Sequence, residues 1–177
     1  MAGFVLTDAS PLLGLARVDG LQWLQPLFGT VWMPAEVRAE MVSAASARCF
    51  AEEAAILHAQ SLGWLQVVVP TPTVPALPDL DEGELACIRI ALIQKADALL
   101  LMDERAGRAV AQERGLKVAG TAAIIGMAKS RGLIDSATEV FSRLHDSDFR
   151  ISAEVIRTII KRVGEPNPTN GHLGGFK

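Results

Sequence analysis

The sequence predicts an α/β fold in which a mainly parallel sheet is covered by helices on both faces. Short apolar runs alternate with helical stretches along most of the 177 residues, a pattern typical of strands joined by crossover helices. Three of the runs, FVLT, LQVVV and ALLLM, are almost continuously apolar, as expected for strands buried on both sides. No internal repeat with a period of about 20–50 residues is visible.

The predicted elements follow one another from the N-terminus. Ser10 is interpreted as a helix cap with Pro11 at the first helical position, and Pro34 opens the next helix. Ser136 and Glu139 form a capping box. The predicted strands cover residues 3–7, 29–33, 65–69, 98–102 and 116–119. Three of the predicted helices begin near Ser10, Pro34 and Ser136. The other predicted helices cover residues 51–62, 81–96, 121–129 and 152–163.

Two segments lack the patterns of helices and strands. The segment PTPTVPALPD, residues 70–79, holds four prolines and is predicted as a stiff extended connection. The C-terminal segment is rich in Pro, Gly and Asn and is predicted to be disordered. The sequence therefore predicts one domain, residues 1–165, followed by a tail, residues 166–177.

Composition and charge narrow the class of protein. No apolar stretch approaches the ~20 residues of a membrane helix, and no basic leader precedes the first strand, so a cytoplasmic protein is expected. Cys49 and Cys87 are interpreted as buried free thiols rather than a disulfide. Residues 1–100 carry a net charge of −6 and residues 101–177 one of +3. This asymmetry favours an acidic site beside a surface for polyanions, although surface charge also varies by chance.

Four acids fall at one edge of the predicted sheet. Asp8 and Asp103 follow the strands at 3–7 and 98–102, and ligands of parallel sheets bind at the carboxyl ends of strands. Glu84 lies in the first turn of the helix that leads into the strand at 98–102, so it returns to the same edge. Glu40 is six residues beyond Pro34, about 9 Å along its helix.

Each acid also has a purely structural interpretation. Asp8 alone is compatible with a turn or cap, Glu40 with a solvated helix face, and Glu84 and Asp103 with helix caps. Their joint placement is what favours a site. Three further acids are interpreted as capping and loop residues: Asp79, Asp81 and Glu82.

Clustered carboxylates indicate a bound cation. Two unit charges about 4 Å apart repel by roughly 4 kcal/mol at an effective dielectric of about 20, so the acids must be protonated or compensated. Oxygen ligands without a Cys or His set suit Mg²⁺ or Mn²⁺ and disfavour zinc. Such an ion activates water and stabilises charge at phosphorus. Ser10 lies where its hydroxyl could orient that water, and capping is an equal alternative.

The residues at these positions resemble the acidic motifs of PIN-domain proteins. The resemblance is carried by TDASPL, EVRAEM, DEGELACIRIAL and ADALLLMDERAGRAVA, and it continues through GLKVAGTAAII and FRISAEVIRTIIKRVGE. The last two segments are similar to a prokaryotic PIN branch related to toxins of toxin–antitoxin pairs. The match covers residues 3–165, and the order and spacing of the motifs carry it rather than any single motif.

The resemblance implies a three-layer α/β/α fold with a central five-stranded sheet and a Mg²⁺- or Mn²⁺-dependent ribonuclease. By motif, Asp8, Glu40, Glu84 and Asp103 match the first to fourth family acids, and they are the expected metal ligands and catalytic residues. Thr121 matches a small polar position near the site. Many PIN domains carry a hydroxyl residue before the fourth acid, whereas this chain has Met102 there and offers Glu104 next to it.

Several cations are candidates for contacts with RNA phosphates. Arg105 and Arg108 follow Asp103 closely, and Lys129 and Arg131 end a later helix. Arg157 and Lys161 share the polar face of the last predicted helix, where a solvated surface is the simpler interpretation. The chain has no Tyr and few other aromatic residues, so a base-stacking platform is not indicated.

Three function hypotheses follow. The leading one is a metal-dependent endoribonuclease, as the toxin of a toxin–antitoxin pair, with RNA, a small antitoxin and a second copy of the chain as partners. The second is a non-catalytic PIN-fold module that binds RNA or protein. The third, another phosphate-handling enzyme, is disfavoured because the chain has neither a P-loop nor a G-x-G-x-x-G motif.

Overall fold

The computed structural model describes residues 3–45, 50–94 and 97–166. The chain divides into two compact units, the first ending at Gly120 and the second beginning at Thr121. Cys49 and all but the first residue of the predicted tail lie outside the described residues. In the part that is described, no helix is both long enough and apolar enough to cross a bilayer.

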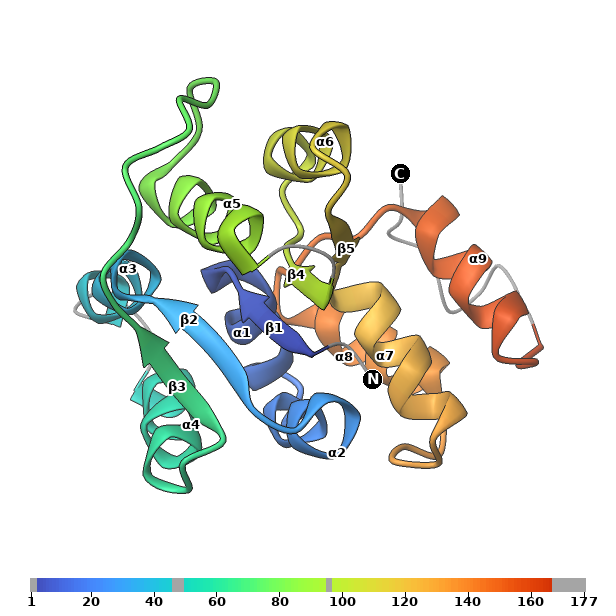
Figure 1. Ribbon diagram of the computed structural model, residues 1–177. Helices are drawn as coiled ribbons and strands as arrows, with labels where there is room; N and C mark the ends of the chain where they lie inside the picture. Colours follow the sequence, from blue (N-terminus) through green and yellow to red (C-terminus); the bar gives the residue numbers. More distant parts are fainter. Residues whose placement is uncertain (1–2, 46–49, 95–96, 167–177) are drawn as a thin grey trace. The chain divides into compact units, whose positions relative to one another are not determined.

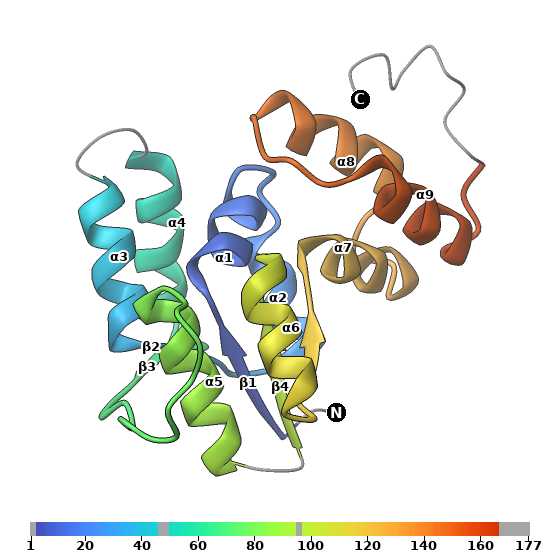
Figure 2. The same ribbon diagram turned by 90° about the horizontal axis from the view of Figure 1, so that it is seen from above.

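The first unit is built around a five-stranded parallel sheet (Figures 1 and 2). The strand order is β3-β2-β1-β4-β5, so β1 lies at the centre and pairs with β2 and β4. The strands are β1 (Phe4–Thr7), β2 (Val31–Pro34), β3 (Leu65–Val68), β4 (Ala98–Leu101) and β5 (Lys117–Ala119). All five predicted strands are confirmed to within two residues.

Helices cover both faces of this sheet. Figures 1 and 2 show α5 and α6 on one face and α1, α2 and α4 on the other, which gives the predicted three-layer α/β/α arrangement. The helices of this unit are α1 (Ala9–Ala16), η1 (Leu21–Trp23), α2 (Leu24–Phe28), α3 (Ala35–Ala45), α4 (Phe50–Ser61), α5 (Glu82–Gln94) and α6 (Arg105–Glu113). The core between the layers is aliphatic, with Leu6, Leu12, Met33, Ile88 and Leu100 fully buried.

One strand is less buried than predicted. The run LQVVV was expected to be covered on both faces, but β3 lies at the sheet edge and pairs only with β2. Gln66 and Val67 are therefore exposed, and Val69 just beyond the strand is 65% exposed. Apolar content alone did not distinguish this edge strand from a central one, because Val is favoured in both positions.

The start of α1 also differs from its prediction. The helix begins at Ala9 and its N-cap is Asp8, whose backbone is extended, so Ser10 is the second helical residue and not the cap. The chain enters this helix directly from β1. Pro11 is then the third helical residue, where its missing N–H costs no hydrogen bond because the first four N–H groups of a helix lack intrahelical acceptors.

The remaining differences are small. The segment 70–79 contains neither helix nor strand, as predicted. The short elements η1 and α2 were not predicted, because the sequence LQWLQPLF carries no capping signal and includes a proline. The helix α6 was also not among the predicted helices. Cys87 is a fully buried free thiol that donates a hydrogen bond to the Thr7 carbonyl oxygen at 3.5 Å, in agreement with the prediction.

The described part of the second unit, residues 121–166, contains three helices, α7 (Thr121–Ser130), α8 (Ala137–Asp146) and α9 (Ala153–Arg162). The predicted cap of α8 is confirmed, because Ser136 Oγ accepts a hydrogen bond from the Glu139 N–H at 3.2 Å. Glu165 also accepts hydrogen bonds from the N–H groups of Ala137 and Thr138. Burial alone would raise the pKa of Glu165, but these bonds and the Thr138 hydroxyl outweigh it and lower the pKa to about 2.

Candidate metal centre

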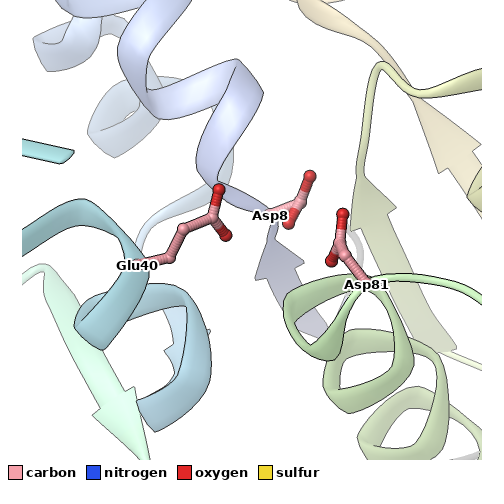
Figure 3. Close-up of side chains that lie close together, drawn as sticks. All are labelled: Asp8, Glu40 and Asp81. Atoms are coloured by element: carbon pink, nitrogen blue, oxygen red, sulfur yellow. The ribbon is translucent and has the colours of Figure 1, made fainter. Parts of the chain in front are cut away.

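Three carboxylates from distant parts of the first unit converge at the carboxyl end of the central strand. Asp8 directly follows β1, Glu40 lies in α3, and Asp81 immediately precedes α5. One oxygen of each carboxylate lies within 4.8 Å of an oxygen of the other two, and Figure 3 shows the side chains pointing toward one another. We call Asp8, Glu40 and Asp81 the carboxylate triad.

The position of Asp8 is set by the sheet. Its N–H donates a hydrogen bond to the Leu101 carbonyl oxygen at 2.9 Å, which extends the pairing of β1 and β4 by one residue. The residue is only 4% exposed. Among the described residues, Asp8 Oδ1 has no hydrogen-bond partner, although a buried carboxylate oxygen normally has one. A missing ligand is therefore indicated at this atom.

Asp81 is held by a reciprocal cap at the start of α5. Asp81 Oδ1 accepts a hydrogen bond from the Glu84 N–H at 2.7 Å, and Glu84 Oε2 accepts one from the Asp81 N–H at 3.4 Å. The prediction of Asp81 as a capping residue is thus confirmed. Its place in the triad was missed, and the D-x-x-E capping pattern at the predicted edge of the sheet was the signal that could have found it.

Glu84, one of the four predicted ligands, lies next to the triad but is not part of it. Glu84 is 3% exposed. Like Asp8 Oδ1, its Oε1 is a buried carboxylate oxygen without a hydrogen-bond partner in the described part of the chain. This atom faces Gly107 in α6. The Glu84 side chain therefore takes part in the cap of its own helix, α5, and also lies against α6.

Asp103, the predicted fourth ligand, is half-buried beyond β4 and lies outside the triad. A Cβ atom added to Gly120 would lie 2.7 Å from Asp103 Oδ1 and 2.9 Å from Arg108 Nη1, so the carboxylate and the guanidinium border the same glycine. Arg108 Nη1 also donates a hydrogen bond to the Met102 carbonyl oxygen at 2.9 Å. The acid and one of the predicted RNA-binding cations thus lie together at this end of the sheet.

The other predicted residues of the first unit have different surroundings. Ser10 is half-buried in the first turn of α1. Glu104 and Arg105 are exposed at the N-terminus of α6, where Glu104 is the N-cap residue without a side-chain cap bond. Both side chains are accessible from solvent.

The remaining predicted residues belong to the second unit. Thr121 is fully buried at the start of α7. Lys129 donates a hydrogen bond to the Asp135 carbonyl oxygen at 2.6 Å and forms an ion pair with Glu165 at 3.5 Å, so this predicted RNA contact already has partners within its own unit. Arg131, by contrast, is exposed.

Burial and mutual repulsion raise the pKa values of the acids at this site. The pKa of Asp8 rises from 3.8 to about 7, mainly because the residue is buried, with smaller increases from the charges of Asp81, Glu40 and Glu84. Burial and the Asp81 charge likewise raise the pKa values of Glu40 and Glu84. Each raised pKa shows that the charged form of the carboxyl group is disfavoured. A bound cation would favour the charged form and lower these pKa values.

The donor set fits a hard divalent cation. Every donor of the triad is a carboxylate oxygen, which suits Mg²⁺ or Mn²⁺ and not zinc. The unpartnered Asp8 Oδ1 supplies a buried oxygen that such an ion would satisfy. A Cβ atom on Gly83 would lie 3.1 Å from this oxygen and 3.3 Å from Glu40 Oε2, so the glycine leaves room for the triad.

An open cavity adjoins the triad. It has a volume of about 650 Å³ and lies between the first turns of α3 and the start of α5. Glu40 and Asp81 belong both to the triad and to the lining, and Glu36 and Glu82 add two further acids. The cavity lining beside the triad is therefore strongly acidic.

The comparisons with known proteins agree with this architecture. A family model described as a PIN domain matches residues 4–165, which is most of the chain. No match was found among curated proteins or among solved structures. PIN domains are generally nucleases that use a divalent metal, and the acidic triad lies where the parallel sheet places its ligands. The chain belongs to the PIN-domain family.

Proposed function

We propose that this protein is a Mg²⁺- or Mn²⁺-dependent endoribonuclease that hydrolyses RNA phosphodiester bonds. The observation that carries the proposal is the convergence of Asp8, Glu40 and Asp81 around a buried carboxylate oxygen without a partner. Membership in the PIN family supports nuclease chemistry at this position. The wide, open cavity beside the triad suits a polymer that must be cut internally.

The triad would hold the metal ion. Asp8 supplies the most buried carboxylate, and Glu40 and Asp81 supply carboxylates that also line the cavity. An ion bound there supplies Lewis acidity, which lowers the pKa of water and offsets negative charge at phosphorus. Glu84 and Asp103 remain proposed additional acids, with Glu84 adjoining the triad through Asp81 and Asp103 standing beyond β4. Ser10 and Thr121 remain proposed supporting hydroxyls.

Cations away from the acids would bind the RNA backbone. The cavity lining carries four acids and would repel phosphates before an ion is bound. Arg105 in the first unit and Arg131 in the second are exposed, and Arg108 and Lys129 are half-buried. We assign phosphate contacts to these side chains, because such contacts need positive charge and accessibility but no defined base geometry.

The biological setting is proposed from the family resemblance. The similarity of the C-terminal motifs to toxin-related PIN proteins supports a toxin that is held inactive by a small antitoxin, and a homodimer as the assembled form. The buried free thiol of Cys87 supports action in a reducing compartment such as the cytoplasm. A small DNA-binding protein encoded by the neighbouring reading frame would support the antitoxin.

RNA cleavage by the purified full chain tests the proposal. We expect labelled single-stranded RNA to be cut internally with Mn²⁺ or Mg²⁺ and to stay intact with EDTA, because the triad needs an ion for the chemistry. Single-stranded DNA of the same sequence serves as the comparison substrate. If RNA remains intact after long incubation with Mn²⁺ yet binds measurably, the protein is a non-catalytic RNA-binding module and the nuclease proposal is wrong.

A further inference from the structure

Gly107 lies where the Glu84 carboxylate packs against α6. A Cβ atom added to Gly107 would overlap Glu84 Oε1, and it would lie 2.7 Å from the Met102 Sδ atom. Gly107 and Glu84 are both buried, and Met102 is fully buried, so the ends of the Glu84 and Met102 side chains would have to shift to admit the Cβ atom. The absent side chain therefore creates a slot in α6 that the Glu84 carboxylate fills.

The backbone of α6 does not itself require glycine at this position. Gly107 is the third residue of the helix, and its φ angle lies outside the left-handed region that favours glycine. A glycine inside a helix is less stable there than alanine, because it loses more conformational freedom on folding. The space occupied by Glu84 is the physical reason for glycine at this position.

The slot connects α6 to the carboxylate triad through a short chain of contacts. Glu84 reaches Gly107 with Oε1 and accepts the Asp81 N–H with Oε2. Asp81 in turn accepts the Glu84 N–H and contributes a carboxylate oxygen to the triad. Displacing the Glu84 carboxylate from the slot would therefore remove the 3.4 Å hydrogen bond that Oε2 accepts from the Asp81 N–H.

We propose that Gly107 is a positioning residue for the candidate metal centre: its missing side chain lets Glu84 sit between α5 and α6 and thereby hold Asp81 in the triad. This inference rests on one part of the proposed function, namely that the triad binds a divalent ion. Gly107 itself touches neither the ion nor the RNA. Groups that orient metal ligands typically change metal affinity about 10- to 100-fold when they are altered.

A double-mutant cycle of Gly107 and Glu84 tests the proposal. In the otherwise unchanged chain, Gly107→Ala is expected to weaken Mn²⁺ binding by about 10- to 100-fold and to lower the melting temperature measured in EDTA. Mn²⁺ affinity is read by calorimetric titration. Gln112→Ala, on the exposed face of the same helix, is the matched control and should leave the affinity unchanged.

The effect of the same substitution should be smaller when the Glu84 carboxylate is absent. In a Glu84→Ala chain, Gly107→Ala is expected to cause no further loss of Mn²⁺ affinity, because the carboxylate that it would displace is gone. It should then lower the melting temperature by less than it does in the unmodified chain, because the contact with Met102 Sδ remains while the contact with Glu84 is gone. If Gly107→Ala merely destabilised α6, it would lower the melting temperature by the same amount with Glu84 present and with Glu84 replaced by alanine.

The cycle separates this inference from the nuclease proposal. If Gly107→Ala alone prevents folding, recovery of a folded protein in the Gly107→Ala, Glu84→Ala chain supports the slot, and failure to recover overturns it. Equal effects of Gly107→Ala in both backgrounds, or unchanged Mn²⁺ affinity in the single variant, also overturn it. If the unmodified chain binds no Mn²⁺, the proposed function fails, while the melting temperatures in EDTA still decide the inference about packing.

Discussion

Replacing Asp8 with asparagine should lower Mn²⁺-dependent RNA cleavage by at least about 100-fold while the chain remains folded. Asparagine has nearly the same shape, so it preserves the packing at the end of β1 and the hydrogen bond from the Asp8 N–H to Leu101. It removes the charge of the most buried carboxylate in the triad, and with it the oxygen best placed to hold an ion. Cleavage rates with saturating Mn²⁺ measure the effect.

A matched control distinguishes this effect from a general change in charge. Asp79 is an exposed acid in the proline-rich connection two residues before Asp81, and it lies outside the triad. Asp79→Asn should keep the cleavage rate of the unmodified chain within about threefold, since exposed charges are screened by salt. Full activity of Asp8→Asn, with circular dichroism confirming its fold, would remove Asp8 from the mechanism.

The metal-free protein should become less stable as the pH rises from about 4 to about 7 because of Asp8. Its folded-state pKa is raised from 3.8 to about 7, so over this interval the folded state binds more protons than the unfolded state. The free energy of unfolding then falls with rising pH, and the loss is complete above the folded-state pKa. A shift of this size corresponds to at most about 4 kcal/mol. Urea unfolding in EDTA at pH 5 and pH 8 measures it.

Asp8→Asn isolates the contribution of this residue. The variant cannot ionise at position 8, so in EDTA it should be more stable than the unmodified chain at pH 8 and should show a weaker dependence on pH. Glu40 and Glu84 also have raised pKa values and contribute in the same direction, so some pH dependence should remain. Identical slopes for the two proteins would show that Asp8 is not the buried, destabilising acid described above.

The position of Asp8 could be predicted from the sequence because it depends on a strong local pattern. A run of four apolar residues followed by an acid places that acid at the carboxyl end of a strand, and sheet topology then brings other strand ends to it. Glu40 could be placed for a similar reason, because Pro34 ends β2 and α3 begins at the same edge. Both inferences needed only element types and their order.

The exact partners of Asp8 could not be predicted in the same way. Asp81 and Glu84 both lie at the start of α5, where their reciprocal cap fixes them relative to each other, and the Asp81 carboxylate is the one in the triad. Asp103 was expected in the cluster because it follows β4. It borders Gly120 and Arg108, outside the triad, and its role as a ligand stays a prediction.

Long-range charge partners were equally hidden. Lys129, which is predicted to contact RNA, also forms an ion pair with Glu165, which lies more than 30 residues later in the chain and caps α8. Net charge and local spacing carry no information about such a pairing. The division of the chain near Gly120 was also not evident, because no linker composition marks the boundary between the two units.

Titration of the full chain with Mn²⁺ tests the central claim most directly. If Asp8, Glu40 and Asp81 form a cation site, Mn²⁺ should bind saturably at pH 8 and stabilise the protein by about 2.7 kcal/mol at 100 times its Kd. Asp81→Asn should weaken this binding by at least about 10-fold, whereas Asp79→Asn should leave it unchanged. A melting temperature that stays constant up to millimolar Mn²⁺, together with no saturable heat of binding, would contradict the account.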